Sequence, residues 1–527
     1  MNVVLISTYE LGHQPFGLAS PAAWLAARGA NVACMDLSRE DFRENDVHSA
    51  DLVALYVPMH TATRLAIALL PQIKDLNPRA HICFYGLYAP VNAGFMRRLG
   101  AQTILGGEFE AGLENLVDRL NNSSSEKMGF FSGSEKANLN PEGATSHSAI
   151  PISMGQAEPE ISLARQRFLV PERGGLPPLV KYAHLILPDG GFRVAGYTEA
   201  SRGCKHLCRH CPIVPVYDGA FRIVQREIVL EDIRRQVAAG AQHISFGDPD
   251  FFNGPTHGLG IVEEMHREFP QLSYDATIKI EHLLNHSEHL PKLRDTGCIF
   301  VTSAVESVDD AVLVKLAKGH TRADFIRAVQ LFRETGLVLQ PTFMPFTPWT
   351  TLDGYSDLLE VLAQQDLIEN VAPIQLAIRL LIPAGSRMLD LLEIRSRVGA
   401  FDAAALMYPW VHSDPRVDAL AENVSRIVEH DEKERRSREE IFAHIWEAAA
   451  LAAGTLAGSS SPSVALLDFT QNGKTRASIP HMNEPWYCCA EPTREQLVSI
   501  GAPNSSLPSA SPAAPTEHSM PQPDAFV

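Results

Sequence analysis

The sequence predicts an α/β protein made of an N-terminal Rossmann-like domain with a parallel sheet, a partial (βα)6 barrel of the TIM type, a helical C-terminal segment and a disordered tail. Short apolar runs alternate with helical patterns over residues 1–120, and the alternation returns with longer spacing over residues 194–385. Strand–helix alternation of this kind builds parallel sheets covered by helices. At 527 residues the chain is also too long for a single hydrophobic core.

The N-terminal unit, residues 1–120, is expected to hold five strands joined by helices. The expected strands are 3–7, 32–36, 51–57, 81–86 and 103–106, and the expected helices are 21–29, 61–75, 91–99 and 108–120. Ligands of such sheets bind beyond the carboxyl ends of the strands. In this unit those ends carry His13 and the segments 58–61, 86–88 and 106–108.

The next segment, residues 121–160, is rich in Ser, Asn, Gly and Pro and is expected to be a disordered linker. The barrel is expected over residues 161–385. Its candidate strands are 194–199, 243–247, 272–279, 299–305, 338–344 and 374–381, and its candidate helices are 228–239, 259–268, 283–295, 308–317, 321–335 and 353–364. The chemistry of such barrels lies at the carboxyl ends of their strands.

The remaining chain is expected to be helical over residues 386–454 and largely disordered over residues 455–527. The helical part carries dense mixed charge, which is typical of a solvated helix face. The tail is rich in Ser, Pro and Ala, a composition that favours disorder. Within it lies one unusual segment, which contains a vicinal cysteine pair flanked by aromatic residues.

The net charge and the number of cysteines argue against several classes of protein. The net charge of −17 argues against a general nucleic-acid footprint, which needs a basic excess. No apolar run reaches the roughly 18 residues of a membrane span, and the N-terminus lacks the basic region of a signal peptide, so we expect a cytoplasmic protein without a membrane anchor. Eight cysteines are too few for a secreted disulfide scaffold, and Cys34, Cys83 and Cys298 are expected to be buried and inert.

The most informative motif follows the first barrel strand. Cys204, Cys208 and Cys211 are spaced C-x3-C-x2-C and are preceded by Arg-Gly. Four thiolates fill the coordination of a [4Fe–4S] cluster, so three leave one iron open to a small molecule. The alternative is a zinc site, for which His206 or His210 in the same loop would supply the fourth ligand.

The triplet and its place after the first strand of a βα array resemble the radical S-adenosylmethionine (SAM) superfamily. The resemblance implies a [4Fe–4S] cluster on the three cysteines and SAM on the open iron. It also implies cleavage of SAM to methionine and a 5′-deoxyadenosyl radical, which abstracts hydrogen from an unactivated carbon. A reductant such as flavodoxin or ferredoxin would supply the electron. The cofactor carries the chemistry, while the protein orients the reacting groups and excludes water.

Four further residues match superfamily segments. Gly247 and Asp248 end the second strand, where relatives bind the amino group of SAM, although a structural turn at this point is an equal alternative. Glu306 closes the fourth strand in a segment that resembles the one contacting ribose and carboxylate. Arg379, on the sixth expected strand, is a weaker candidate for the carboxylate of the cofactor. Two further residues, Lys318 and His320, are expected to be surface and capping residues.

The N-terminal unit resembles the cobalamin-binding domain that precedes many radical SAM enzymes. The resemblance rests on Gly12, Pro15 and Gly17, on the step from Gly29 to Asp36, on residues 50–53 and on Gly106 to Glu110. The Asp-x-His-x-x-Gly signature that supplies a histidine to cobalt is missing. His13 is therefore either a cobalt ligand or a loop histidine that lines the site, and the domain either binds cobalamin or has kept only the fold.

The tail contains Cys488 and Cys489 within a Cys-Cys-Ala-Glu-Pro motif, residues 488–492. It resembles the CCAEP-tail (or CUAEP-tail) family of radical SAM proteins, some of which carry selenocysteine in the pair. That resemblance implies a redox or nucleophilic role for the cysteine pair. The pair would reach the mouth of the barrel and act there as a thiol relay, a methyl or hydrogen-atom donor, or a soft-metal ligand. The alternative is that the tail only docks.

The leading interpretation is a radical SAM enzyme with possible use of cobalamin for methyl transfer to an unactivated carbon of a small-molecule or peptide substrate. A second interpretation keeps the radical chemistry without cobalamin, in a rearrangement, ligation or sulfur-insertion reaction. A third makes the cysteine triplet a non-catalytic iron–sulfur or zinc centre. No nucleic-acid partner is expected under any of them.

Overall fold

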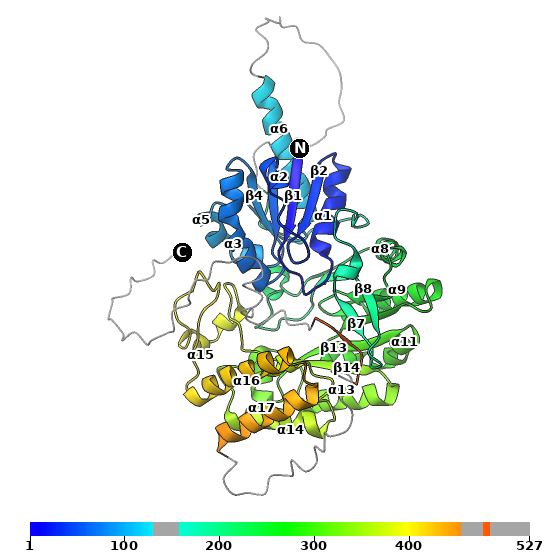
Figure 1. Ribbon diagram of the computed structural model, residues 1–527, viewed down its shortest axis with the longest axis vertical. Coiled ribbons are helices and arrows are strands. Elements are labelled where there is room, and N and C mark those ends of the chain that lie inside the picture. The colour runs from blue at the N-terminus through cyan, green and yellow to red at the C-terminus, as the bar shows by residue number, and fades with distance from the viewer. Residues whose placement is uncertain (130–157, 455–477, 485–527) are drawn as a thin grey trace, which may run out of the picture.

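The computed structural model describes residues 1–129, 158–454 and 478–484, and its two large sheets are stacked along the long axis of the molecule (Figure 1). The first sheet has the strand order β2-β1-β3-β4-β5-β6, and all its strand pairs are parallel. Its strands are β1 (Asn2–Ser7), β2 (Asn31–Asp36), β3 (Leu52–Tyr56), β4 (His81–Tyr85), β5 (Thr103–Gly107) and β6 (Ile161–Ser162).

Helices cover both faces of this sheet because its strands are apolar on both sides. In β1, Val4 and Ile6 belong to one hydrophobic cluster, whereas Val3 and Leu5 belong to another on the opposite face. The helices of this domain are α1 (Phe16–Ala27), α2 (Glu44–His48), α3 (His60–Leu76), α4 (Tyr88–Val91), α5 (Ala93–Arg98) and α6 (Glu110–Gly129). The Rossmann-like domain predicted from the sequence is therefore confirmed.

Helix α1 begins earlier than expected, at Phe16 and not at Pro21. A proline inside a helix lacks the N–H that would bond the carbonyl four residues earlier. That carbonyl belongs to Gly17, and it accepts a hydrogen bond of 2.9 Å from the Tyr85 hydroxyl. The tyrosine replaces the missing backbone donor, so the helix runs through Pro21.

The segment expected to be a linker, residues 121–160, also carries structure at its ends. Helix α6 continues to Gly129, and residues 158–160 lead into β6, which pairs with β5 through Ile161 and Ser162. The chain therefore returns to the N-terminal sheet before it enters the barrel. The residues between 129 and 158 lie outside the described part of the chain.

The second sheet has the order β14-β13-β12-β11-β8-β7-β15. Strands β8, β11, β12, β13 and β14 are parallel, and β7 and β15 run antiparallel at one edge. The strands are β7 (His184–Ile186), β8 (Phe192–Thr198), β11 (His243–Phe246), β12 (Ser273–Thr277), β13 (Cys298–Glu306), β14 (Val338–Phe343) and β15 (His481–Met482). This curled half-barrel confirms the predicted partial barrel.

The sixth strand expected at 374–381 does not form as predicted. Residues 373–376 form a 3-10 turn, and only a single parallel bridge joins Phe346 to Arg379. Here the Gln375 side chain accepts a hydrogen bond of 3.2 Å from the backbone N–H of Phe343 in β14. That donor would otherwise serve the carbonyl of an adjacent strand, so a side chain takes the place of the sixth strand.

Helices cover the outer face of the half-barrel. They are α8 (Arg226–Ala238), α9 (Pro255–Glu268), α10 (Ile280–Asn285), α11 (Leu290–Asp295), α12 (Asp310–Leu316), α13 (Arg322–Thr335) and α14 (Leu352–Gln364), with 3-10 turns η1 (Leu179–Lys181), η2 (Phe251–Asn253), η3 (Ser287–His289), η4 (Pro373–Leu376) and η5 (Arg387–Asp390). The ends of α13 show how the local sequence determines where a helix begins and stops. The helix begins with a reciprocal capping box between Thr321 and Asp324 and ends at Gly336, whose φ is 71°.

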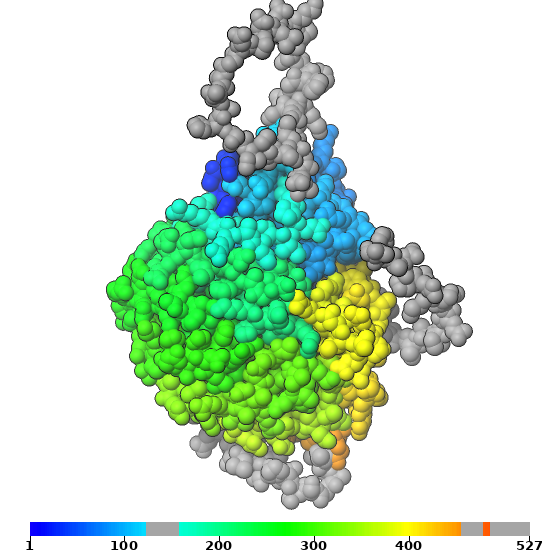
Figure 2. Space-filling model, turned by 180° about the vertical axis from the view of Figure 1, so that it is seen from behind, coloured from blue at the N-terminus to red at the C-terminus, as the bar shows by residue number. Residues whose placement is uncertain are grey.

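The C-terminal region adds α15 (Leu392–Arg395), α16 (Pro415–Lys433) and α17 (Arg438–Ala453). Val424 of α16 and Phe442 of α17 belong to the same hydrophobic core as the barrel strands, so these two helices extend the barrel. Figure 2 shows the yellow part of this region packed against both the barrel and the N-terminal domain. One contact across that boundary is the 2.8 Å hydrogen bond between His60 Nε2 and the carbonyl of Ala405.

Candidate active site

One cavity of about 360 Å³ lies between the two sheets. From the N-terminal domain it is lined by the loops that follow β1, β3, β4 and β5, which place His13, Met59, Tyr88 and Phe109 along it. From the half-barrel it is lined by the loop carrying the three cysteines and by the carboxyl ends of the parallel strands. The ligand edges of both sheets therefore face one shared space.

The cysteine loop is pinned as a hairpin. Strand β9 (Ser201–Gly203) pairs antiparallel with β10 (Phe221–Ile223) beyond a short helix, α7 (Val214–Tyr217), and the Cys204 amide donates to the carbonyl of Ala220 at 3.1 Å. Gly203 has a φ of 74°, and a Cβ there would lie 2.4 Å from the Tyr217 ring. Only glycine fits this position, which explains the Arg-Gly pair before the first cysteine.

All three thiols, Cys204, Cys208 and Cys211, line the cavity. Cys208 is buried, and burial raises the pKa of the Cys204 thiol to about 11 in the absence of metal. A buried cation, Lys318, also lines the cavity and is 3% exposed. Burial opposes its charge, but Glu306 and then Cys208 and Cys211 raise the pKa of Lys318 above its usual value. Three thiols on one loop beside a buried ammonium fit a cluster with negatively charged ligands.

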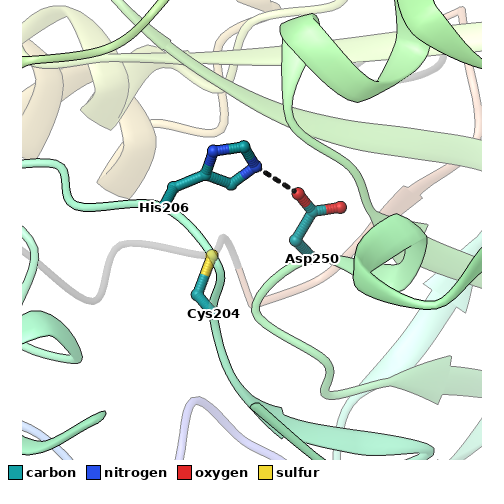
Figure 3. A group of neighbouring side chains, drawn as sticks. All are labelled: Cys204, His206 and Asp250. Atoms are coloured by element: carbon teal, nitrogen blue, oxygen red, sulfur yellow. Dashed lines mark ion pairs between the residues drawn. The ribbon is translucent and has the colours of Figure 1, made fainter. Parts of the chain in front are cut away.

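The two histidines of the loop are held by carboxylates. His206 Nε2 lies 3.3 Å from Asp250, and His210 Nε2 lies 3.1 Å from Glu306. Figure 3 draws the first of these ion pairs. Cys204, His206 and Asp250 come close enough for one ligand atom of each to lie within 4.8 Å of the others. A zinc site would therefore recruit Asp250 as well as a loop histidine, which differs from the Cys3His arrangement expected from the sequence.

Asp250 connects the cysteine loop to the barrel. It follows β11, accepts a hydrogen bond from the Phe252 amide, and lies 2.7 Å from His282 Nδ1 on α10 as well as near His206. Burial alone would raise the pKa of Asp250, but hydrogen bonds from the two histidines outweigh it and hold the pKa below its usual value. This carboxylate therefore stays charged and fixes both imidazoles.

Gly247 and Asp248 line the cavity, and the structure shows what packs around them. A Cβ at Gly247 would lie 1.9 Å from the Tyr197 hydroxyl, so a side chain has no room. Both oxygens of Asp248 accept hydrogen bonds, from the Ala200 amide at 2.8 Å and the Ser201 hydroxyl at 2.6 Å. Asp248 therefore anchors the start of the cysteine loop, and its burial raises its pKa to about 7.

Glu306 closes β13 with a φ of 69°, an uncommon conformation for a residue with a side chain. Burial opposes its charge, but Lys318 and His210 lower the pKa of Glu306 to about 2. Lys318 Nζ lies 3.5 Å from Glu306 Oε1. The expectation that Lys318 and His320 are surface residues is wrong, because both side chains are buried against this end of β13.

Arg379 is engaged elsewhere. It forms an ion pair of 2.6 Å with Asp418 of α16, donates to the carbonyl of Trp410 at 2.7 Å, and stacks over the Trp410 ring. It does not line the cavity. This placement argues against the predicted contact with the carboxylate of a cofactor, since the irregular sixth segment directs Arg379 toward the C-terminal helices.

His13 lies in the loop after β1 and lines the cavity. Its ring stacks on Tyr197 of the half-barrel, with the ring centroids 4.7 Å apart. Burial lowers the pKa of His13 to about 4, so the imidazole is neutral at pH 7. In this structure His13 joins the two domains as a packed loop histidine, one of the two roles considered from the sequence.

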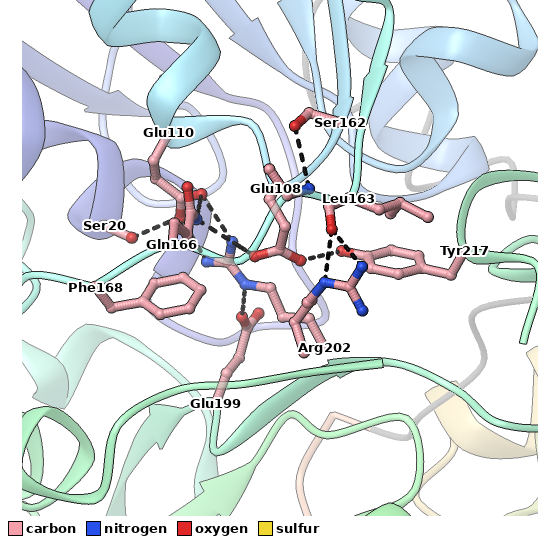
Figure 4. A network of polar contacts seen from close by, with 12 residues as sticks. Ser20, Glu108, Glu110, Ser162, Leu163, Gln166, Phe168, Glu199, Arg202 and Tyr217 are labelled. Carbon is pink, nitrogen blue, oxygen red and sulfur yellow. Dashed lines mark hydrogen bonds and ion pairs between the residues drawn. The ribbon is translucent and has the colours of Figure 1, made fainter. Parts of the chain in front are cut away.

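A buried charged network lies directly before the cysteines and was not predicted from the sequence (Figure 4). Arg202 lies 2.6 Å from Glu199 and 2.7 Å from Glu110, and Tyr217 donates to Glu108 at 3.0 Å. Arg202 also stacks near the rings of Phe16, Phe109 and Phe168. The acidic Gly-Gly-Glu-Phe-Glu segment was visible in the sequence, but its burial against Arg202 depends on the domain arrangement.

Cys488 and Cys489 lie outside the described residues, as does the rest of the motif at 488–492. The described segment 478–484 ends four positions before Cys488, and Glu484 lines the cavity. Among the described helices, none combines the length and apolar character needed to cross a membrane.

Residues 198–354 match the family model described as the Radical SAM superfamily. The barrel of this chain is therefore a radical SAM domain, with the three cysteines at its first loop. The hopanoid C-3 methylase of Methylococcus capsulatus is 25% identical over 344 residues, which cover 64% of this chain and 62% of that protein. A tRNA-2-methylthio-N(6)-dimethylallyladenosine synthase of Desulfosudis oleivorans is 27% identical over 198 residues, 36% of this chain and 41% of that protein. The chain thus spans less than two thirds of these relatives.

Solved structures share both domains. The cobalamin-dependent SAM radical enzyme OxsB, with aqua-cobalamin and SAM bound, aligns with a TM-score of 0.61 at 14% identity and covers 89% of this chain and 74% of that one. The methyltransferase TsrM from Kitasatospora setae, with cobalamin and a [4Fe-4S] cluster bound, gives a TM-score of 0.52 at 18% identity over 69% of this chain and 70% of that one. The likeness establishes a Rossmann-like domain joined to a partial barrel.

Proposed function

We propose that this protein is a radical SAM enzyme that binds a [4Fe–4S] cluster through Cys204, Cys208 and Cys211. The observation that carries the proposal is the convergence of the three thiols in a cavity inside a radical SAM domain. A bound, reduced cluster would supply the electron that cleaves SAM to methionine and a 5′-deoxyadenosyl radical. A reductant such as flavodoxin or ferredoxin would reduce it, and the protein is expected to work in the cytoplasm.

The residues around the thiols would then have separable roles. Lys318 balances the negative charge of Cys208 and Cys211, while Glu306 keeps that lysine charged. Gly247 keeps the wall free of a side chain, and Asp248 fixes the start of the loop through Ser201. Both line the space into which SAM would extend, so Gly247, Asp248 and Glu306 remain our candidates for contact with SAM.

We further propose that the N-terminal domain holds cobalamin and that the reaction is methyl transfer to an unactivated carbon of a small-molecule or peptide substrate. The support is that the loops after four parallel strands open into the cavity that also contains the thiols. The comparisons add a hopanoid methylase and two cobalamin-dependent enzymes of the same fold. When bound, cobalamin would carry the methyl group. The neutral His13 lies on this side of the cavity and would line the corrin site.

Cys488 and Cys489 are proposed to act on the substrate at the same cavity. Glu484 lines the cavity, and four residues of extended chain reach up to about 14 Å. A Cys488→Ser/Cys489→Ser variant should keep the cluster and SAM cleavage but lose product formation. Normal turnover by that variant would refute a chemical role for the pair.

Anaerobic reconstitution tests the proposal as a whole. The holoenzyme should hold about four iron and four sulfide per chain with a broad thiolate-to-iron absorbance. It should also form 5′-deoxyadenosine from SAM under dithionite. Stoichiometric zinc without SAM cleavage would overturn the radical mechanism. Bound cobalt with a corrinoid spectrum separates methyl transfer from the cobalamin-independent alternative, which is a rearrangement, ligation or sulfur insertion.

A further inference from the structure

The half-barrel has two edges that a complete barrel would join. Its sheet begins at β14 and, on the other side, reaches β7. Closing a sheet on itself removes such edges, whereas an open half-barrel leaves the inner cavity exposed between them. The open side is where a substrate chamber would otherwise meet solvent.

Residues 478–484, which we call the strap, span this open side. At the β14 edge, Gln340 Nε2 donates to the carbonyl of Pro480 at 2.7 Å, and the Ser478 amide donates to the nearby Glu369 carboxylate. The strap then forms β15, which adds to the β7 edge of the sheet (Figure 1). Both edges of the half-barrel are therefore bound by one short piece of chain.

The strap is fixed to β7 by reciprocal hydrogen bonds. The Asn483 amide donates to the carbonyl of His184 at 3.0 Å, and the His184 amide donates to the Asn483 side-chain oxygen at 2.9 Å. These bonds continue the register in which His481 pairs with Ile186 and Met482 pairs with Leu185. Asn483 thus ends the pairing with its side chain as well as its backbone.

The last residue of the strap reaches the N-terminal domain. Glu484 forms an ion pair of 3.0 Å with Arg39, in the loop after β2. A Cβ at Gly12 would lie 1.4 Å from the Glu484 carboxylate, so the loop after β1 provides a seat that only glycine leaves open. The strap therefore joins both edges of the half-barrel to the domain above it.

His481, Met482 and Glu484 line the same cavity as the three thiols. We propose that the strap is the closing wall of the substrate chamber, with His481 and Met482 on its inner face. The inference rests on the proposed radical SAM function, because the wall matters only if a radical must be shielded. Shielding keeps water and small hydrogen donors away from a reactive intermediate.

Three changes in the full-length chain open the wall at separate points. Gln340→Leu removes the bond to Pro480, Asn483→Ala removes the side-chain bond to His184, and Gly12→Ala displaces the Glu484 carboxylate. Two changes serve as matched controls. Gln72→Leu changes an exposed residue of α3. Gly29 has a φ of 77°, close to the 72° of Gly12, and a Cβ added by Gly29→Ala would meet nothing within 4 Å.

Two measurements read the outcome. Hydrogen–deuterium exchange at the His184 amide should rise at least tenfold in Asn483→Ala and stay at the wild-type rate in both controls. Substrate-free formation of 5′-deoxyadenosine by the reconstituted holoenzyme, with dithionite as reductant and dithiothreitol as a small hydrogen-atom donor, should rise at least threefold in all three wall variants.

The outcomes separate the wall from the underlying chemistry. Unchanged exchange in Asn483→Ala would show that the strap does not dock as described. Raised exchange with unchanged 5′-deoxyadenosine formation would overturn its role as a wall. A wild-type protein that binds iron but cleaves no SAM would refute the proposed radical function and, with it, the wall, while the exchange data would still decide whether the strap docks.

Discussion

Arg202 Nη2 lies 2.7 Å from Glu110 Oε1, and both side chains are buried where the N-terminal domain meets the cysteine loop. Arg202 belongs to β9, two positions before Cys204, whereas Glu110 begins α6 of the Rossmann-like domain. Ser20 also donates to Glu110 at 2.7 Å, which ties the pair to α1. The position of the cysteine loop is thus coupled directly to the domain that faces it.

Arg202→Met should lower the free energy of unfolding by about 3–5 kcal/mol, because it leaves a buried carboxylate without its cation. The double variant Arg202→Met/Glu110→Gln should regain part of that loss. The Arg28–Glu114 pair is the control, since Arg28 is exposed and Arg28→Met should lower the free energy of unfolding far less. Urea unfolding followed by circular dichroism measures all three, and equal losses for Arg202→Met and Arg28→Met would contradict the buried-pair interpretation.

Cys204→Ala, Cys208→Ala and Cys211→Ala should each reduce bound iron from about four per chain to near zero, because each removes one of three protein ligands. SAM cleavage should disappear with the iron. Cys34→Ala is the control, since Cys34 is buried in β2 of the N-terminal sheet and does not line the cavity. Iron that persists in all three loop variants would place the cluster elsewhere in the chain.

Lys318→Met should make the reduction potential of the cluster more negative, by an amount on the order of tens of millivolts, because a positive charge beside the cluster favours the reduced form. The charge lies next to Cys208 and Cys211 and is paired with Glu306. Lys318→Arg preserves the charge and should stay near the wild-type potential. A redox titration followed by electron paramagnetic resonance compares the three proteins. Identical potentials would show that Lys318 does not lie close to the cluster.

His60 should make the free energy of unfolding depend on pH, and one variant can test its contribution. Burial lowers the pKa of His60 to about 4, whereas the unfolded chain has the ordinary value of 6.5. Between these values the unfolded state binds more protons, so stability is full above pH 6.5 and falls as the pH drops toward 4. The loss should reach about 3 kcal/mol at the lower end.

A His60→Gln variant should lose less stability between pH 6.5 and pH 4 than the wild-type protein does. The exposed His48→Gln variant should follow the wild-type curve. Denaturant midpoints measured at several pH values give the comparison. A parallel fall for His60→Gln and the wild-type protein would mean that His60 is charged in the native state.

The sequence was sufficient to predict the two sheets and the cysteine loop because both depend on local patterns. Apolar alternation defined the strands, and C-x3-C-x2-C with its preceding glycine identified the loop. The buried ion pair of Arg202 could not be predicted, because its partner Glu110 lies 92 positions away and its burial depends on how two domains pack. Lys318 was misjudged for a related reason, since a lysine after a helix is usually exposed unless a partner such as Glu306 is buried with it.

The sixth strand failed for a different reason. Residues 374–381 have the apolar composition of a strand, but the side chains of Gln375 and Asn370 bond backbone groups of β14. The strap was missed because a two-residue strand between polar segments gives no periodic signal. Its role depends on Gln340 and Asn483, whose partners lie 140 and 299 positions away.

Because the strap lies far beyond β14 along the chain, it can dock only after the strands of the half-barrel have been made. The barrel strands are complete by Phe343, but the piece that seals them is made 140 residues after its partner Gln340. During synthesis the half-barrel therefore stays open at this side until residues 478–484 have been made. If the strap is the closing wall, the cavity with the three cysteines is reachable through that side during this interval.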